Sequence, residues 1–424
     1  MENTEKNAFD MIGISERVLD LCLECEQELT ERFNEIDNVA LVNTAKVMSA
    51  FKNNRISDSH FKATTGYGYD DMGREAIERV YAEIFGTEDA LVRINFVNGT
   101  HSLSTAIAGN LMPGDLLVSI TGAPYDTLAE TIGIVENNMS LISMGVKYNQ
   151  VELKDGTFDT ERVLDIIRNN KVKMVFIGRS RGYATRPSQT IQQIEKIIRD
   201  IKDIDNKVIV MVDNCYGEFV EQLEPTQVGA DIMAGSLIKN LGGGLCETGG
   251  YIVGKKELVE NAAKRLTAPG IGKECGATLG KNKEILQGLF MAPQAVKNAL
   301  KTAVLTAAML EKLGYEVSPS AWEYRTDIIQ SVILRDEQKL VSFIQGIQAA
   351  SPVDSFVVPE PWAMPGYINP VIMAAGTFVS GASIELSCDA PVKEPYAVFM
   401  QGGLTYESAK LGICTAIDNM IRGK

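Results

Sequence analysis

Short apolar runs alternate with helix-patterned segments along most of the chain after residue 90. The runs are bounded by turn-forming residues, which is typical of strands covered on both faces of a parallel sheet. Between them, residues 160–170 and 190–202 place apolar side chains at helical spacing. This alternation predicts an α/β domain with a mostly parallel sheet and helices on both faces. The predicted strands are residues 90–94, 115–120, 173–178, 207–213, 230–236 and 249–254.

The N-terminal part of the chain has a different pattern. Residues 15–54 carry a recurring apolar face that predicts two helices, and the spacing of Ile77, Val80, Tyr81 and Ile84 predicts another. A segment rich in Gly, Tyr and Asp lies between them. We therefore expect a helical arm over residues 1–63 ahead of the α/β domain.

The pattern changes again after about residue 280. A long helix is expected over residues 293–313, and further strands are expected at 327–335, 381–387 and 396–403. We therefore expect the large α/β domain to cover residues 64–290 and a smaller C-terminal α/β domain to cover residues 291–424.

Composition and charge narrow the class of partner. The formal net charge of −14 argues against nucleic acid or an anionic membrane surface as the main partner. No apolar run approaches the ~20 residues that a membrane span needs, and the N-terminal segment is too polar for an ordinary secretory signal. The seven scattered cysteines are typical of reduced thiols. We expect a cytoplasmic protein with a small-molecule substrate.

The number and spacing of histidine, cysteine and glycine residues argue against several classes of enzyme. His60 and His101 are the only two histidines, which disfavours zinc hydrolases and Ser-His-Asp hydrolases. Cys22 and Cys25 form a lone C-x-x-C inside a helix pattern, so packing is favoured over metal binding, and we expect no metal. The chain has no phosphate-loop motif of the nucleotide-binding type, and "GYGYDDMG" does not fit a dinucleotide fingerprint.

Chemically distinctive residues gather at the ends of the predicted strands. Asp213 ends one strand, Ser236 and Lys239 follow another, and Gly99 and Thr100 lie where the first strand gives way to a helix. Ligands of open α/β sheets bind beyond the carboxyl ends of the strands. If these strands are neighbours, an acid, a lysine and a helix N-terminus meet in one crevice.

This set of groups suits pyridoxal 5'-phosphate (PLP). A lysine amine forms a Schiff base with its aldehyde, which favours a lysine of depressed pKa, and a buried carboxylate keeps the pyridine nitrogen protonated. Free N–H groups at Gly99 and Thr100, with the Ser236 hydroxyl, would bind the phosphate. Tyr125, after another strand end, could stack on the ring.

Each residue also has an ordinary interpretation when it is taken alone. A lysine beside glycines is usually a surface loop residue, and an aspartate at a strand end can cap a helix. Gly99 and Thr100 could form a simple turn, and Tyr125 could be a packing residue. The combination at converging strand ends favours the cofactor.

Several segments together give a resemblance to a known family. "TGYGYDDMGRE", "NGTHSL", "RSRGYATRPS", "SLIKNLGGGL", "TAPGIGKE" and "FMQGGLTYE" span residues 65–407. With Asp213 ahead of "SLIK", they resemble the aspartate-aminotransferase-like fold of PLP enzymes. Within it, they are most similar to the Cys/Met-metabolism branch and its cystathionine beta-lyase-like aluminium-resistance proteins, related to methionine gamma-lyase.

The resemblance implies a role for each candidate residue. Lys239 would be the Schiff-base lysine, Asp213 the partner of the pyridine nitrogen and Tyr125 the stacking ring and an acid or base at the leaving group. The phosphate contacts would be Gly99, Thr100 and Ser236. Tyr67 or Tyr69 would reach into a neighbouring subunit, which implies a homodimer or homotetramer with shared active sites.

The chain departs from that branch at the substrate-carboxylate position. The stretch "YAVFMQGGL" lacks the arginine that those lyases carry near their last strand. "GRSRGYATRPS" replaces their turn after the third strand, and Arg179 or Arg181 is our candidate for the carboxylate.

The sequence therefore predicts a PLP-dependent carbon–sulfur lyase acting on a sulfur-containing amino acid. Two alternatives stay open: an aminotransferase or racemase with the same cofactor, and a non-catalytic PLP-fold protein that binds a ligand or serves metal tolerance.

Overall fold

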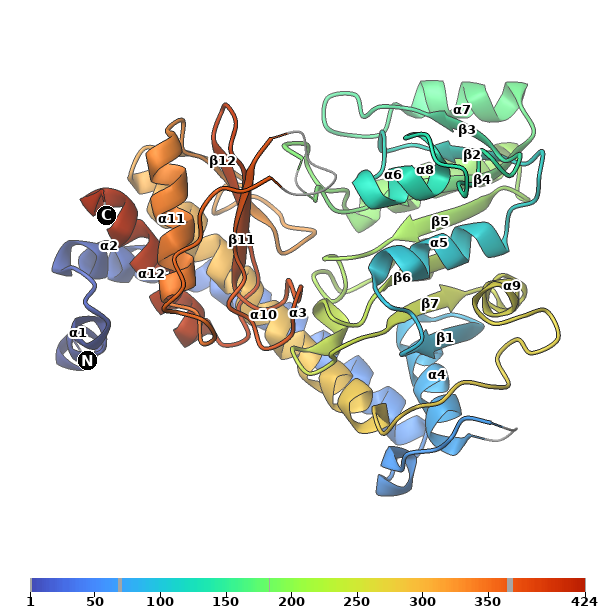
Figure 1. The fold of residues 1–424 in the computed structure, drawn as a ribbon, viewed down its shortest axis with the longest axis horizontal. Coiled ribbons are helices and arrows are strands. Elements are labelled where there is room, and N and C mark those ends of the chain that lie inside the picture. Colours follow the sequence, from blue (N-terminus) through green and yellow to red (C-terminus); the bar gives the residue numbers. More distant parts are fainter. Residues whose placement is uncertain (1, 68–70, 183, 364–368, 424) are drawn as a thin grey trace.

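The computed structural model describes residues 2–67, 71–182, 184–363 and 369–423. Its larger part is built on a seven-stranded sheet with the strand order β1-β7-β6-β5-β4-β2-β3 (Figure 1). The strands are β1 (Asp89–Arg93), β2 (Leu116–Ser119), β3 (Lys147–Gln150), β4 (Val172–Gly178), β5 (Ile209–Asp213), β6 (Ile232–Ser236) and β7 (Gly250–Gly254). All six predicted apolar runs contribute a strand; β3, which is short and polar, was not predicted.

The sheet is mostly parallel, as expected, with one exception. Strands β3, β2, β4, β5 and β6 pair in parallel, whereas β7 pairs antiparallel with both β6 and β1. β7 is buried along its whole length, so its apolar run could not distinguish the two pairings. Two antiparallel steps also make β1 point the same way as β6, so their carboxyl ends lie at one edge.

Helices cover both faces of this sheet, which confirms the α/β fold class (Figure 1). One face packs apolar side chains from α5 (Gly99–Gly109), α6 (Asp126–Ile132) and α9 (Lys256–Leu266) against alternate strand residues. The other face packs against α4 (Met72–Phe85), α7 (Thr160–Asn169) and α8 (Ile191–Ile204). Alternate residues of β4 point to opposite faces, so Phe176 and Ile177 belong to different clusters.

A second sheet forms the smaller part of the molecule. It has five strands in the order β10-β11-β12-β9-β8, all antiparallel. Its elements are β8 (Glu316–Ser318), β9 (Gln330–Ile333), α11 (Glu337–Ala349), β10 (Val371–Ala374), β11 (Ser387–Pro391), β12 (Ala397–Gln401) and α12 (Tyr406–Arg422). The expected strand at 381–387 is wrong except for its last residue, since residues 381–386 form turns that begin at Gly381, where φ is +78°.

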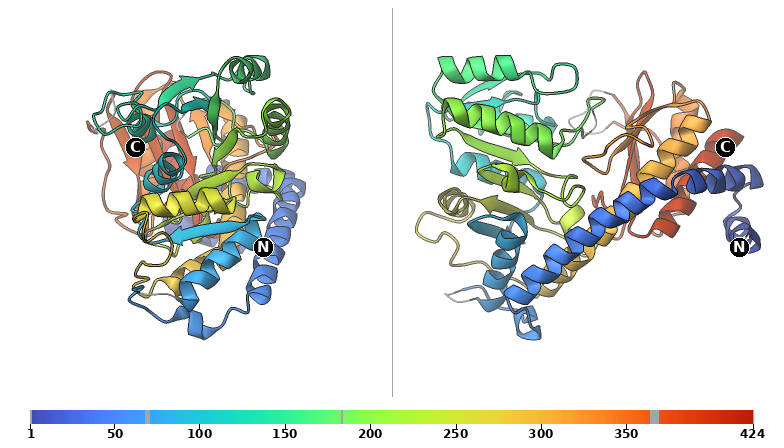
Figure 2. Two further views of the ribbon diagram at one scale, coloured as in Figure 1. Left: turned by 90° about the vertical axis from the view of Figure 1, so that its right-hand side faces the viewer. Right: turned by 180° about the vertical axis from the view of Figure 1, so that it is seen from behind.

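Two long helices join the parts. α3 (Thr30–Asn53) and α10 (Asn282–Lys312) run side by side (Figure 2), and Lys301 of α10 forms an ion pair with Asp37 of α3 at 2.8 Å. α1 (Glu2–Ile12) and α2 (Glu16–Glu28) precede them, so the two helices expected over residues 15–54 are confirmed as α2 and α3.

α10 begins eleven residues before the predicted start at 293. It therefore contains Pro293 in its interior, where a proline removes one helical N–H without ending the helix. The helix packs against β8, β9 and β12 of the small sheet and against α4 and the turn at 240–242 of the larger part, so the boundary proposed at residue 290 lies within a shared helix.

Candidate active site

The predicted site residues meet at the carboxyl edge of the large sheet. Asp213 is the last residue of β5, Ser236 the last of β6, and Lys239 lies three residues further on. β5 and β6 are parallel neighbours, so their carboxyl ends share this edge. Gly99 begins α5, and a Cβ atom built on it would lie 3.3 Å from the Cβ of Ser236.

Lys239 is held over an aromatic ring. Its Nζ lies 4.0 Å from the ring centroid of Tyr216, which is cation–π contact. Tyr216 has a φ of +72°, an uncommon backbone state for a tyrosine. The sequence analysis did not single out Tyr216. Its position three residues after Asp213, at the same strand end, could have marked it as a site residue.

The electrostatic surroundings of Lys239 correct one expectation. Burial lowers its pKa, but the neighbouring Cys215, Tyr216 and Asp213 outweigh burial and raise the pKa well above its ordinary value. The depressed pKa expected from sequence is therefore wrong for the chain by itself. The physical reason is that the negative charges these groups carry when ionised favour the ammonium form of the amine.

Asp213 is buried at the same edge. Its Oδ1 accepts a hydrogen bond from the backbone N–H of Cys215 at 3.0 Å. Burial raises the pKa of Asp213, and the positive charge of Lys239 opposes that rise. A cationic group placed against this carboxylate would hold it ionised.

Ser236 supplies an unusual polar atom. Its side chain is fully buried, and its Oγ has no hydrogen-bond partner among the described residues. A buried hydroxyl without a partner costs free energy, so its position beside the α5 N-terminus needs an explanation. The first N–H groups of a helix also lack intrahelical acceptors, and together these donors form a site suited to an anion such as a phosphate.

Thr100 and Tyr125 close one side of this anion site. The Thr100 Oγ1 lies 3.0 Å from the phenol oxygen of Tyr125 and 2.9 Å from Oγ1 of Thr127. Tyr125 is the residue before α6, and 44% of its side chain is exposed. Burial of the phenol and the nearby Asp213 raise its pKa. The tyrosine is thus a protonated group bordering the edge that carries Lys239.

The glycines after Lys239 allow the turn to touch α10. A Cβ atom on Gly242 would collide with the carbonyl oxygen of Leu237, and one on Gly288 of α10 would collide with the carbonyl oxygen of Gly242. Gly243 has a φ of +54°, which favours glycine. The turn that carries Lys239 is therefore packed backbone to backbone on a long helix.

Arg179 and Arg181, the sequence candidates for the substrate carboxylate, both contact other groups of this chain. Arg179 is fully buried, and its guanidinium forms a 2.6 Å ion pair with Glu221. Arg181 is also buried and donates to Ser318 of the small domain at 2.9 and 3.0 Å. Both guanidinium groups are thus buried in contacts within the chain, although the Nε atom of each has no hydrogen-bond partner among the described residues.

The two candidate tyrosines lie on a surface segment. Tyr67 is 91% exposed, so within one chain its ring contacts no site residue. Tyr69 lies outside the described residues.

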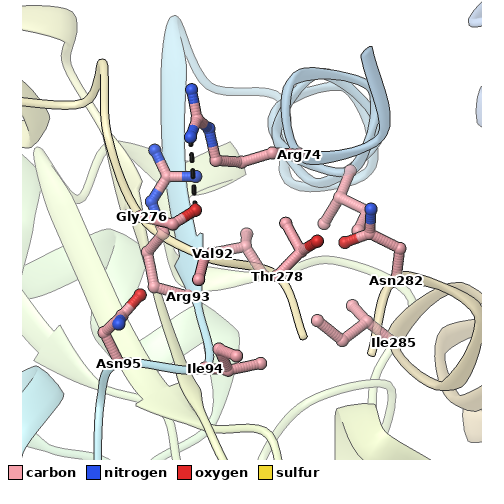
Figure 3. Close-up of a pocket in the computed structure, with 11 residues that line it drawn as sticks. Arg74, Val92, Arg93, Ile94, Asn95, Gly276, Thr278, Asn282 and Ile285 are labelled. Carbon is pink, nitrogen blue, oxygen red and sulfur yellow. Dashed lines mark hydrogen bonds between the residues drawn. The ribbon is translucent and has the colours of Figure 1, made fainter. Parts of the chain in front are cut away.

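A small cavity of about 10 Å³ lies apart from this site (Figure 3). Arg74 of α4 donates to the carbonyl oxygen of Gly276 at 3.3 Å, and Arg93 of β1 donates to that of Lys273 at 2.9 Å. These buried arginines, which the sequence did not single out, fix the loop that runs beside Tyr67. Neither Lys239 nor Asp213 lines the cavity.

No described helix is both long and apolar enough to span a membrane. No group of three or more described His, Cys, Asp or Glu side chains is arranged to hold a metal ion.

The chain is similar in sequence and in overall structure to known proteins. The uncharacterized protein YnbB of Bacillus subtilis is 49% identical over 98% of this chain and 99% of its own. A solved structure from Clostridium acetobutylicum, described as a candidate cystathionine beta-lyase involved in aluminum resistance, is 50% identical with a TM-score of 0.95 over 99% of both chains.

A Clostridium novyi structure, described as a carbon–sulfur lyase involved in aluminum resistance, is 46% identical with a TM-score of 0.94 over 97% of this chain and 98% of its own. A more distant structure, the PLP-dependent protein YhfS of Escherichia coli, is 14% identical with a TM-score of 0.61 over 90% of this chain and 96% of its own, and shows the shared fold. The profile of the methionine gamma-lyase family matches residues 18–421. The chain therefore belongs to the methionine gamma-lyase family.

Proposed function

We propose that this protein is a PLP-dependent carbon–sulfur lyase that acts on a sulfur-containing amino acid, of the cystathionine beta-lyase or methionine gamma-lyase kind. The observation that carries the proposal is the convergence of Lys239, Asp213 and the partnerless hydroxyl of Ser236 on one edge of the sheet. Family membership and the descriptions of the two Clostridium structures support the reaction class.

The residues present fit PLP. The buried Ser236 hydroxyl and the N–H groups at Gly99 and Thr100 would bind its phosphate. Gly99 leaves only 3.3 Å between a built Cβ and Ser236, so a side chain there would enter the anion site. Asp213, buried at the neighbouring strand end, would face the pyridine nitrogen, and Lys239 would bind the aldehyde carbon.

PLP, when bound, supplies an electron sink for a substrate α-carbon. The chain's own residues then handle protons. Lys239 would take the α-proton as general base, and the Tyr216 ring would stabilise the ammonium group that results. Tyr125, protonated and bordering the site, would donate a proton to the leaving sulfur.

We also propose that the active form is a homodimer or a larger homo-oligomer. The segment that contains Tyr67 lies against the loop around Gly276, where Gly276 N–H donates to the Gly66 carbonyl oxygen at 2.9 Å. Tyr67, Ile271 and Leu279 expose apolar side chains on these two adjacent segments, and exposed apolar groups of this kind favour an interface.

Reconstitution with PLP tests the cofactor assignment. The purified chain should gain visible absorbance, and borohydride should fix a pyridoxyl group on Lys239, detected by peptide mass spectrometry. Lys239→Ala should lose both signals and at least ~10³-fold in activity, because the covalent attachment and the general base are removed together. Lys256→Ala, at an exposed position of α9, is the control. A colourless wild-type chain would contradict the assignment.

Product analysis tests the reaction class. With L-cystathionine or L-methionine, release of pyruvate or 2-oxobutyrate together with a thiol supports the lyase. Amino-group transfer to an added keto acid, or loss of optical activity alone, would identify an aminotransferase or racemase.

A further inference from the structure

A guanidinium group that the sequence did not single out lies beside the candidate site. Arg186 follows β4 by eight residues and is half-buried. Its Nη2 donates to the carbonyl oxygens of Gly178 at 2.9 Å and Ser180 at 2.5 Å, and its Nη1 donates to that of Pro187 at 3.1 Å. These bonds fold the loop back so that the guanidinium lies over the carboxyl end of β4.

The register of the sheet places this group next to Asp213. Gly178 of β4 and Asp213 of β5 are paired residues of two parallel strands, so their side-chain directions point to the same face of the sheet. A Cβ atom built on Gly178 would lie 3.6 Å from Nη2 of Arg186. Arg186 therefore lies within van der Waals contact of the space that a side chain at 178 would enter, on the face to which Asp213 points.

Exposure separates Arg186 from the two earlier candidates. Arg179 is fully buried beside Glu221, and Arg181 is buried and donates through Nη1 to Ser318, whereas Arg186 is half-buried. Among the described residues no carboxylate lies within ion-pair distance of Arg186; Asp327 and Asp213 act on it from further away, and its hydrogen bonds go to neutral carbonyl oxygens. A partly exposed guanidinium with no direct ion pair, at the edge of a ligand site, suits an anionic group of the ligand.

We infer that Arg186 binds the α-carboxylate of the amino-acid substrate, an inference that rests on the proposed function. It deepens that function because it locates the residue that distinguishes an amino acid from a simple amine. Arg186 takes the role for which Arg179 and Arg181 were the sequence candidates.

Paired ligands that differ only in the carboxylate test this assignment. Holoenzyme is titrated by absorbance with L-methionine against 3-(methylthio)propan-1-amine, and with L-alanine against ethylamine. Wild type should prefer the acid in each pair by about 10- to 100-fold, the range expected for charge-assisted hydrogen bonds. Arg186→Gln should lose that preference, and Arg186→Lys should retain part of it because it keeps the charge without the planar fork. Arg199→Gln, an exposed charge removal on α8, should behave as wild type.

The outcomes distinguish the residue from the function. Unchanged acid preference in Arg186→Gln, or no acid preference in wild type, overturns the assignment. An equal loss for acids and amines, with altered cofactor absorbance against pH, also overturns it and places the guanidinium on the cofactor ring. An acid preference that depends on Arg186 in both pairs, without thiol release from any sulfur-containing amino acid, supports the assignment and contradicts the proposed lyase function. If Arg186→Gln does not retain PLP, the acid-to-amine affinity ratio of Arg186→Lys decides. A ratio below that of wild type supports the assignment, and an unchanged ratio overturns it.

Discussion

At the scale of single residues, the site combines a polar group without a partner and a charged group that its neighbours stabilise. Ser236 has a buried hydroxyl without a described partner, whereas the ammonium form of Lys239 is favoured by acidic neighbours and an aromatic face. The hydroxyl without a partner costs stability in the cofactor-free chain. Such a group is expected where a ligand completes the bonding.

Ser236→Ala should therefore have effects of opposite sign on stability and on binding. Removing a hydroxyl without a partner should raise the free energy of unfolding of the cofactor-free chain by about 1 kcal/mol. The same change should weaken PLP binding by about 10-fold, because one phosphate donor is lost. Denaturant unfolding and a fluorescence titration with PLP measure the two effects.

The matched control is Ser102, which is equally buried but donates to the carbonyl oxygens of Gly99 and Gly235 at 2.8 Å. Ser102→Ala should destabilise the chain. If both substitutions lower stability alike, the Ser236 hydroxyl has a partner within the protein.

Glu218 gives a pH dependence that can be assigned to one group. Its carboxyl is fully buried and accepts a hydrogen bond from the Tyr251 hydroxyl at 2.7 Å. Burial raises its pKa from 4.5 to about 8. In this interval the unfolded chain releases the proton and the folded chain keeps it. The free energy of unfolding should therefore fall as the pH rises from about 4.5 to about 8, and this contribution should be constant above that pH.

Glu218→Gln should remove that contribution. Between pH 5 and pH 8 the variant should lose less stability than wild type, by on the order of a few kcal/mol. Guanidinium unfolding of the cofactor-free chains at both pH values measures the difference. Glu161→Gln, at an exposed position of α7, controls for the loss of a surface charge. Parallel pH profiles for wild type and Glu218→Gln would contradict the assignment.

At the scale of elements, the position of Lys239 depends on the contact between its turn and α10. Gly242, Gly243 and Gly288 let two backbones meet with no side chain between them. β6 fixes the direction in which the chain enters the turn, and α10 fixes where the turn stops. The Lys239 amine is thus positioned by the junction of a strand and a helix that are far apart in sequence.

Gly288→Ala should disturb this junction. An alanine is better than glycine inside a helix by roughly 0.5–1 kcal/mol, but its Cβ would collide with the Gly242 carbonyl oxygen. Overpacking of this kind typically costs about 1–3 kcal/mol, so we expect a net loss of stability together with weaker PLP binding. The neighbouring Gln287→Ala, at an exposed position, should leave both nearly unchanged. A stabilised Gly288→Ala chain would show that the turn can move away freely.

At the scale of the whole molecule, the site is expected to need a second chain. The proposed interface involves the exposed Tyr67 segment and the loop that Arg74 and Arg93 hold in place (Figure 3). In a two-fold assembly, each copy offers the same surface to the other. Removal of Tyr67 in one chain should therefore damage the partner's site rather than its own.

Mixing two inactive chains tests shared sites. Lys239→Ala and Tyr67→Ala chains, each weakly active alone, should regain about a quarter of wild-type activity when they are unfolded, mixed and refolded. Half of the dimers are then hybrids, and each hybrid has one intact site. Differently tagged chains and native mass spectrometry confirm that hybrids form. Hybrids without recovered activity would show that Tyr67 acts within its own chain or not at all.

The sequence predicted the features that follow from local rules. Short apolar runs located six strands of the large sheet, and the residues that end those runs included Asp213 and Ser236. The helical periodicity of residues 15–54 located α2 and α3. The prediction was wrong where local signals conflict with packing, as for residues 381–386 and for the start of α10, where Pro293 lies inside the helix.

By itself, the sequence determined that Asp213, Ser236 and Lys239 lie at or just after strand ends. The apolar run that forms a strand and the turn residues that bound it are local features of the sequence. The tertiary structure decided how the arginines after β4 are placed and which groups surround Lys239. Folding buries Arg179 and Arg181 in contacts within the chain and leaves Arg186 half-buried over the carboxyl end of β4. The pKa of Lys239 depends on groups that only folding brings to it, so no local pattern could give its direction.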